Sequence, residues 1–158
     1  MISEEVKQFI GKADPPIVRH VERGAIKRYA EAVGNDNPLY CDEEYAKKSR
    51  YGSIIPPPGF FGWPTRTPSS STGLAEIVGE LQAALARSGY PRILDGGISY
   101  DFFVPIRAGD TLIASPKVTG LTEKEGKSGA MVICDFETTY VNQNGDVVAK
   151  SYQTFIAR

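Results

Sequence analysis

The hydrophobic and polar positions divide the chain into two parts of different character. Up to about residue 90, apolar side chains recur at helical spacing in segments separated by polar loops. From about residue 92, apolar and polar residues alternate in long runs that are typical of strands. Helices followed by a set of antiparallel strands predict an α+β fold, and we expect one domain over residues 1–158.

Helices are predicted at four places in the first part. Residues 1–9 form a short amphipathic segment, and residues 24–33 carry apolar side chains at helical spacing up to Gly34, which ends the helix. Asp42 is typical of an N-cap, so a short helix is expected from there toward Gly52. The last predicted helix, residues 73–88, places apolar side chains on one face: Leu74, Ile77, Val78, Leu81 and Leu85.

Strands are predicted in the second part and once near the start. Their expected ranges are residues 17–21, 98–104, 111–122, 130–141 and 147–156. The Asn144-Gly145 pair predicts a tight hairpin before the last strand, because these residues adopt the positive φ angles of such turns. Residues 125–127 mark an earlier hairpin. One face of the strand over residues 130–141 is expected to carry Val132, Cys134, Phe136, Thr138 and Tyr140.

The segment from residue 54 to residue 72 has an unusual composition. It contains Pro56-Pro57-Pro58 and further prolines, which exclude a long regular helix. It also contains Phe60, Phe61 and Trp63, so part of it is expected to be buried. Two interpretations stay open: the aromatic side chains belong to the core, or they line a ligand pocket. The proline run is either a rigid turn or the lip of that pocket.

Composition and charge exclude several classes of function. The chain is 41% hydrophobic and 23% charged with a formal net charge of −1, which is typical of a globular domain and unlike a nucleic-acid-binding protein. No apolar run has the length of a membrane span, and the first residues do not resemble a signal peptide, so we expect a cytoplasmic protein with Cys41 and Cys134 reduced. His20 is the single histidine; we interpret it as an ordinary strand residue and expect no metal site.

Three local patterns carry a resemblance to a known family. Residues 32–40 read AVGNDNPLY and are followed by Asp42 and Ala46; residues 102–112 read FFVPIRAGDTL; residues 140–148 read YVNQNGDVV. In this order and spacing, the patterns resemble the MaoC-like or (R)-specific enoyl-CoA hydratase family, and especially its FAS1-like dehydratase N-terminal branch. Each pattern has a local explanation as well, since Asn, Asp and Pro favour turns, and Gly109-Asp110 is expected to open a strand.

The resemblance implies a fold, a substrate class and a site. The fold is a hot-dog, in which a long antiparallel sheet wraps around a central helix, and the substrate is an acyl thioester carried on coenzyme A or acyl carrier protein, with no further cofactor. In active members the loop after the first helix reads Gly-Asp-x-Asn-Pro-x-His, and its Asp and His hold a water and move protons. By this comparison the expected substrate-binding residues are Asn37, Pro38, Pro58, Gly59, Phe60, Phe61 and Trp63.

Both catalytic positions of that loop are substituted in this chain. Gly34, Asn37 and Pro38 match the motif, but Asn35 stands at the position of the Asp and Tyr40 at that of the His. A His-Gly pair expected near the central helix reads Pro58-Gly59. Asparagine is not a base, and a tyrosine with a pKa of about 10 rarely serves as one near neutral pH. We therefore assign no catalytic residue. Asp36 is the candidate to substitute for the missing base. Tyr40 is alternatively an ordinary half-buried aromatic residue.

The sequence leaves three functional interpretations open. The first is a subunit of an enoyl-CoA hydratase or (3R)-hydroxyacyl-thioester dehydratase that shapes the acyl pocket and pairs with a catalytic MaoC-like subunit. The second is a self-sufficient homodimeric hydratase that uses Asp36 and Tyr40, or a thioesterase of the same fold. The third is an acyl-CoA-binding protein without enzymatic activity. Arg66, in the Pro- and Ser-rich stretch, is a candidate for contact with a coenzyme A phosphate.

Overall fold

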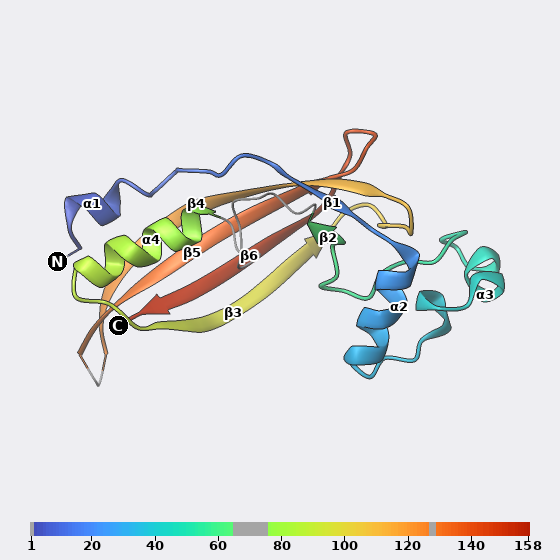
Figure 1. The fold of residues 1–158 in the computed structure, drawn as a ribbon, viewed down its shortest axis with the longest axis horizontal. Coiled ribbons are helices and arrows are strands. Elements are labelled where there is room, and N and C mark those ends of the chain that lie inside the picture. The colour runs from blue at the N-terminus through green and yellow to red at the C-terminus, as the bar shows by residue number, and fades with distance from the viewer. Residues whose placement is uncertain (1, 65–75, 127–128) are drawn as a thin grey trace.

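The computed structural model describes residues 2–64, 76–126 and 129–158, with Trp63 and Pro64 described by their backbone. Its described strands form one antiparallel sheet of six strands in the order β2-β1-β4-β5-β6-β3. Figure 1 shows the long strands running side by side along the molecule. Their bounds are β1 Ile17–His20, β2 Trp63–Pro64, β3 Ile93–Phe102, β4 Thr111–Gly126, β5 Gly129–Val141 and β6 Val147–Ala157.

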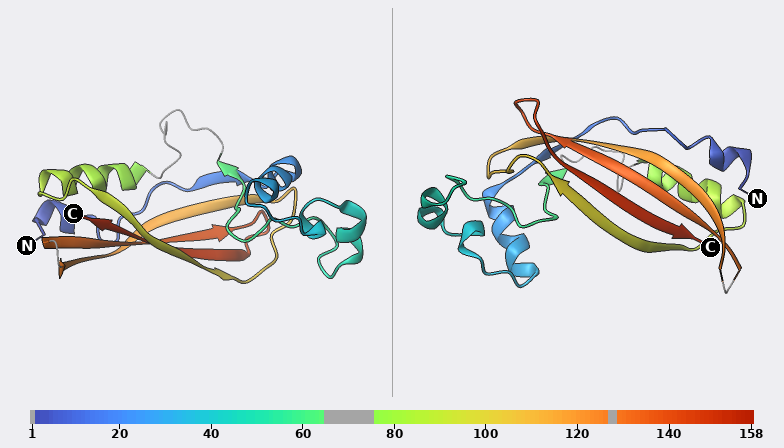
Figure 2. Two further views of the ribbon diagram at one scale, coloured as in Figure 1. Left: turned by 90° about the horizontal axis from the view of Figure 1, so that it is seen from below. Right: turned by 180° about the vertical axis from the view of Figure 1, so that it is seen from behind.

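The helices gather at the two ends of the sheet. At one end α1 (Glu4–Lys7) and α4 (Glu76–Arg87) lie against one face of the sheet, as the two views of Figure 2 show. At the other end α2 (Arg23–Ala32), the 3-10 helix η1 (Pro38–Tyr40) and α3 (Glu43–Lys48) form an overhang beyond the strand ends (Figure 1).

The hydrophobic core has two clusters that correspond to these two ends. Beneath α4, the buried side chains of Ile77, Val78, Leu81 and Leu85 pack with Val132, Cys134 and Phe136 of β5. Beneath the overhang, the second cluster includes Ala25, Ile26, Phe60, Phe61, Leu112 and Tyr140. The alternation predicted for β5 is confirmed, since Val132, Cys134, Phe136 and Tyr140 are all buried and Thr138 is half-buried. Leu74 lies outside the described residues.

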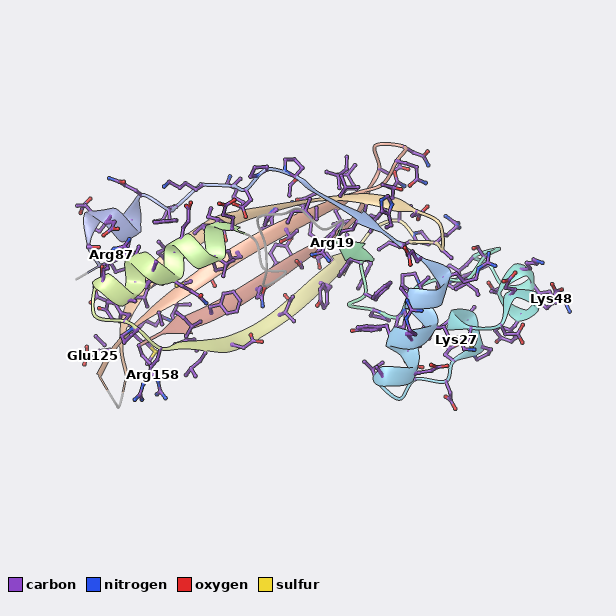
Figure 3. The ribbon with its side chains drawn as sticks, in the orientation of Figure 1. Arg19, Lys27, Lys48, Arg87, Glu125 and Arg158 are labelled. Carbon is purple, nitrogen blue, oxygen red and sulfur yellow. The ribbon has the colours of Figure 1, made fainter. Side chains whose placement is uncertain are left out.

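Polar contacts attach α4 and α1 to the rest of the chain. Both carboxylate oxygens of Asp14 accept from the backbone N–H of Ile77, at 3.0 and 3.1 Å, at the start of α4. At the other end of the helix, Arg87 pairs with Glu5 of α1, at the position labelled in Figure 3. Because a helix start leaves N–H groups without intrahelical partners, the Asp14 carboxylate supplies a cap from a distant part of the chain.

Several predicted elements differ from the observed ones in their bounds. The predicted strand over residues 98–104 begins at Ile93 instead, because β3 pairs with β6 through a bulge between Asp95 and Gly97 that interrupts the alternation. β4 continues to Gly126.

The Asn144-Gly145 turn differs from the predicted one, in which both residues adopt positive φ angles. Gly145 has a φ of 87°, but no non-glycine residue in the described chain has a positive φ. Asn142 closes the loop instead, since its Oδ1 accepts from the N–H groups of Asn144 and Asp146.

The strand β2 was not predicted because Pro64 lies in it. Gly62 just before it has a φ of 77°, and a Cβ there would lie 2.6 Å from the carbonyl oxygen of His20. A glycine is therefore needed for this segment to approach β1. The helices α1 to α4 fall on the four predicted segments, whereas η1 was not predicted. Asp42 caps α3 by accepting from the N–H of Tyr45 at 3.0 Å.

Two findings concern the wider interpretation of the chain. Within the described ranges, no helix is both long enough and apolar enough to cross a membrane. Over the same residues, no group of three or more His, Cys, Asp or Glu side chains is placed to hold a metal ion. Cys41 and Cys134 are both free thiols, the first exposed and the second buried.

Candidate functional site

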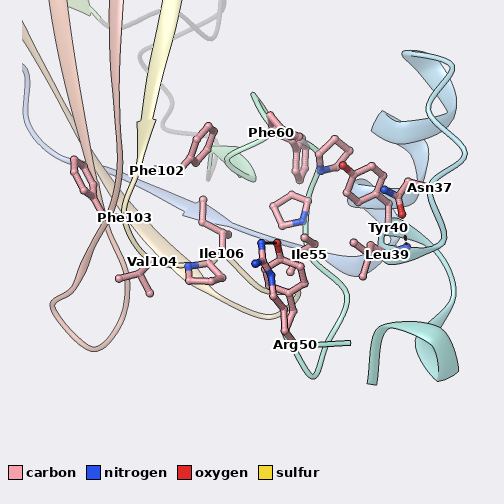
Figure 4. A pocket seen from close by; sticks show the side chains of 15 residues that line it. Asn37, Leu39, Tyr40, Arg50, Ile55, Phe60, Phe102, Phe103, Val104 and Ile106 are labelled. Atoms are coloured by element: carbon pink, nitrogen blue, oxygen red, sulfur yellow. Dashed lines mark hydrogen bonds between the residues drawn. The ribbon is translucent and has the colours of Figure 1, made fainter. Parts of the chain in front are cut away.

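A pocket of about 700 Å³ lies between the ends of the strands and the overhang (Figure 4). This volume is within the range of small-molecule sites, which are concave and mostly apolar with a few polar groups. One wall comes from the loop and 3-10 helix after α2, a second from the proline run, and a third from the residues at and after the end of β3. The lining residues are Asn37, Leu39, Tyr40, Arg50, Tyr51, Ile55, Pro56, Pro57, Pro58, Phe60 and residues 102–106.

The loop after α2 is held by its own asparagine side chains. Asn35 is exposed, and its Oδ1 accepts from the backbone N–H of Asn37 at 3.2 Å. The Oδ1 of Asn37 accepts in turn from the N–H of Leu39 at 3.0 Å and caps η1. Such local bonds explain why these residues form this turn. Asn37 lines the pocket, whereas Asn35 and Asp36 are outside its lining and Asp36 is exposed.

Tyr40 is a buried wall of the pocket. It is 8% exposed, and its ring belongs to the hydrophobic cluster beneath the overhang. The η1 helix places it there, because Asn37 begins this helix and Tyr40 ends it. The expectation of a half-buried aromatic is therefore too weak: the ring is buried, and it is also part of the pocket wall.

The proline run and the following aromatic residues divide between pocket and core. Pro58 and Phe60 line the pocket, and the Phe60 ring lies 5.1 Å from the ring of Tyr29. Phe61 is outside the lining and stacks on Tyr140, with ring centroids 4.1 Å apart and an interplanar angle of 11°. Phe60 therefore belongs both to the core cluster and to the pocket lining, and Phe61 to the core cluster alone. The side chain of Trp63 and all of Arg66 lie outside the described residues.

Tyr100 of β3 lies beside the aromatic residues of the pocket and the core. Its ring lies 5.4 Å from that of Phe61. Burial raises the pKa of the Tyr100 phenol, with smaller contributions from Tyr140 and Tyr29. This phenol therefore stays protonated near neutral pH, and it does not supply the base that the loop positions lack.

The turn after β3 is fixed by a residue from a different hairpin. Asp110 accepts from the backbone N–H of Arg107 through Oδ2 at 2.8 Å, and from Gln143 Nε2 through Oδ1 at 2.9 Å. Gln143 also accepts from the N–H of Thr111 at 3.0 Å. The second and third sequence patterns therefore contact each other, and the first and second line the same pocket. Asp110 has the structural role that was predicted for the Gly109-Asp110 turn.

The predicted substrate-binding residues are only partly brought together. Asn37, Pro58 and Phe60 line the pocket, while Pro38, Gly59 and Phe61 do not. Sequence reasoning missed Arg50, Tyr51 and Ile55, which lie between two motifs and become neighbours of the pocket through the fold. It also gave no pocket role to residues 102–106, although they open the second pattern.

With this geometry, the chain can be compared with known proteins. Residues 8–151 match the family described as FAS1-like, dehydratase domain region. The chain belongs to this family. Among sequence relatives, a protein of Streptomyces avermitilis named UPF0336 is 28% identical over 153 residues, which cover 96% of this chain and 94% of the relative. A protein of Thermomonospora curvata named probable enoyl-CoA hydratase alpha subunit is 28% identical over 129 residues, 78% of this chain and 40% of that protein.

Solved structures share the fold. The ChsH1-ChsH2 complex of Mycobacterium tuberculosis contains a chain that matches with a TM-score of 0.78 and 18% identity, over 98% of this chain and 94% of that one. The (3R)-hydroxyacyl-ACP dehydratase complex HadBC of Mycobacterium tuberculosis contains a chain that matches with a TM-score of 0.67 and 21% identity, over 99% of both chains. A MaoC-like dehydratase of Rhodospirillum rubrum matches with a TM-score of 0.58 and 22% identity, over 94% of this chain and 91% of that one. The predicted hot-dog fold is confirmed by these structural matches.

Proposed function

We propose that this chain is the substrate-shaping subunit of a two-subunit enoyl-thioester hydratase or (3R)-hydroxyacyl-thioester dehydratase. It binds the acyl part of a thioester in the pocket beneath the overhang, and a second hot-dog subunit supplies the catalytic Asp and His. The substrate arrives on coenzyme A or acyl carrier protein.

The observation that carries this proposal is the chemistry of the pocket wall. Its described polar side chains are those of Asn37, Tyr40, Arg50 and Tyr51, and no carboxylate or imidazole is among them. In hydration, the water oxygen bonds to C3 of the enoyl group while C2 gains a proton, so a base must take a proton from the water. Neutral amide and phenol groups and a guanidinium do not accept that proton near neutral pH. The pocket is built to bind, and another subunit must provide the base.

The edge strand β3 is the proposed contact for that subunit. Among the described strands, β3 pairs with β6 alone, and its side chains Leu94, Ile98 and Phe102 are 42%, 47% and 51% exposed. Soluble proteins usually cover or charge such an edge, since its free N–H and C=O groups pair readily with another strand. Phe102 and Phe103 also line the pocket, so a partner on β3 would close the side of the pocket that these residues leave open.

Two kinds of relative support the two-subunit form. The Thermomonospora curvata relative is named an alpha subunit, and two of the structures of the same fold are complexes of two different chains, ChsH1-ChsH2 and HadBC. The alternative of a self-sufficient enzyme requires Asp36 at the pocket, yet Asp36 is exposed and outside the lining. The described pocket lining, which has no carboxylate or imidazole, also fits a purely acyl-CoA-binding protein, and the names of the relatives favour the subunit.

Restoring the two missing groups tests the proposal. Asn35→Asp keeps the oxygen that accepts from the Asn37 N–H, so the turn is expected to survive, and Tyr40→His places an imidazole in the pocket wall. Hydration of crotonyl-CoA is followed by loss of the enoyl absorbance, and the wild-type chain alone is expected to be inactive. The double variant is expected to stay inactive as well, because position 35 is exposed and outside the pocket lining. Each single variant is the matched control and should stay inactive. Hydration by the wild-type chain alone, abolished by Asp36→Asn, would instead establish the self-sufficient enzyme.

A further inference from the structure

Arg50 gives the pocket its charge. Among the described lining residues it is the single charged one, and it is exposed; most of the remaining lining is formed by proline, phenylalanine and aliphatic side chains. Figure 4 shows its side chain reaching into the space between Ile106 and Leu39. A pocket with a mostly apolar lining and one cation fits a ligand that has an apolar tail and an anionic group.

Among the described residues, no carboxylate pairs with the guanidinium of Arg50, whereas Arg23 and Arg87 each pair with a glutamate. Its Nη2 donates to the hydroxyl of Tyr51 at 2.6 Å, and its carbon Cζ lies 4.8 Å from the centre of the same ring. A guanidinium has five N–H donors, so most of them remain for a ligand.

Tyr51 and Arg107 hold the Arg50 side chain in this position. Arg107 Nε donates to the backbone carbonyl of Tyr51 at 3.0 Å, and the Arg107 N–H is itself fixed by Asp110. The chain of contacts runs from the turn after β3, through Tyr51, to Arg50 in the pocket lining. An arginine oriented before binding loses less freedom when it binds, and its planar donors match the oxygens of a phosphate.

From this geometry we propose that Arg50 binds a phosphate group of the carrier arm of the thioester, with Tyr51 and Arg107 as its positioning residues. This inference rests on the proposed function for the acyl thioester and adds the residue that recognises the carrier. The phosphate is common to coenzyme A and to the phosphopantetheine of acyl carrier protein. Arg50 therefore contributes affinity for the carrier, while the apolar wall contributes affinity for the acyl chain.

Calorimetric titration of the full chain with two thioesters tests the inference. Butanoyl-CoA carries phosphates, and S-butanoyl-pantetheine carries the same acyl group and arm without them. Arg50→Gln is expected to weaken butanoyl-CoA binding roughly tenfold to a hundredfold, the range for loss of a charged hydrogen bond. The same change should leave the affinity for S-butanoyl-pantetheine within about twofold. Arg50→Lys and Tyr51→Phe should weaken butanoyl-CoA binding less, because both keep the positive charge. The first loses the planar set of guanidinium donors, and the second loses the hydroxyl that holds the guanidinium.

Lys48→Gln is the matched control, since it removes one positive charge two residues away in α3 but is outside the pocket lining. It should leave both affinities unchanged. Butanoyl-acyl carrier protein distinguishes the carriers: a loss with both carriers places Arg50 at the shared phosphate, and a loss with coenzyme A alone places it at a phosphate of the nucleotide. Equal weakening of both small thioesters by Arg50→Gln would overturn the inference and leave the proposed function standing. Failure of the wild-type chain to bind either thioester would overturn both.

Discussion

Gln143 holds Asp110 through a hydrogen bond of 2.9 Å from its amide Nε2 to the carboxylate Oδ1. The bond joins the loop between β5 and β6 to the turn that begins β4. The residues just before that turn, 102–106, line the pocket. The hairpin therefore supports one wall of the binding site without touching it.

Replacing Gln143 measures the value of this support. Gln143→Ala removes the bonds to Asp110 Oδ1 and the Thr111 N–H, and it is expected to lower the free energy of unfolding by about 1 kcal/mol, because water can reach the exposed partners. Urea unfolding provides the measurement. Gln8→Ala is the control, since the Gln8 side chain is exposed and forms no hydrogen bond with the described residues. Equal free energies of unfolding for the two variants would contradict the claim that Gln143 stabilises the turn at Asp110.

Phe61 should contribute much more to stability than the exposed Phe103. Phe61 is 5% exposed and stacks on Tyr140, whereas Phe103 is 56% exposed. Phe61→Ala is expected to cost about 3–5 kcal/mol, as is usual for a buried phenylalanine, and Phe103→Ala less than about 1 kcal/mol. Thermal or urea unfolding of both variants tests this difference. A small loss for Phe61→Ala would mean that the cluster beneath the overhang is looser than its ring stacking indicates.

The proposed contact along β3 predicts a position-dependent effect of added charge. Ile98→Lys at the edge strand should prevent association with a second hot-dog subunit, because a lysine at an edge opposes strand pairing. Ile113→Lys is the control: Ile113 is 40% exposed, close to the 47% of Ile98, but β4 is flanked by β1 and β5. Light scattering after gel filtration measures the mass of the complex. Association that survives Ile98→Lys but not Ile113→Lys would place the contact elsewhere.

The two cysteines should differ in reactivity. Burial, with a smaller effect of the Asp135 carboxylate, raises the pKa of the Cys134 thiol to about 12, and Cys41 is exposed. Since the thiolate is the reactive form, Cys134 should stay protonated and unreactive at pH 9 in the folded chain. A thiol reagent is expected to titrate one cysteine in the native protein and two in denaturant. Native labelling that persists in Cys41→Ser would show that Cys134 is accessible.

Much of the fold follows from local sequence patterns, for identifiable reasons. The strand β5 is predictable because apolar residues recur at every second position from Val132 to Phe136 and again at Tyr140, and α4 because its apolar side chains share one face. β3 was predicted too short because Asp95, Gly96 and Gly97 break the alternation, and only pairing with β6 extends the strand to Ile93. Such pairing depends on residues far away in the sequence.

The site was predictable to a smaller extent. The first pattern identified Asn37 and the position of Tyr40, because the loop carries its own capping bonds and its place in the family is recognisable. Arg50 has no such local pattern: it follows α3 in a polar stretch, and its relation to residues 102–106 arises only when the overhang faces the strand ends. By the resemblance to the family motif, Asn35 and Tyr40 stand at the positions of its Asp and His, and the functional proposal depends on this expected substitution.

Hydration of enoyl-CoA thioesters by the purified chain, alone and together with a hot-dog chain of the same genome that carries the intact Gly-Asp-x-Asn-Pro-x-His motif, tests the central claim most directly. The enoyl absorbance should remain constant when this chain is present alone. It should decrease when the two chains are combined. Replacing the Asp of the partner motif should abolish that activity, and Asn35→Ala in this chain should leave it largely intact. Hydration by this chain alone at the rate of the mixture would contradict the account.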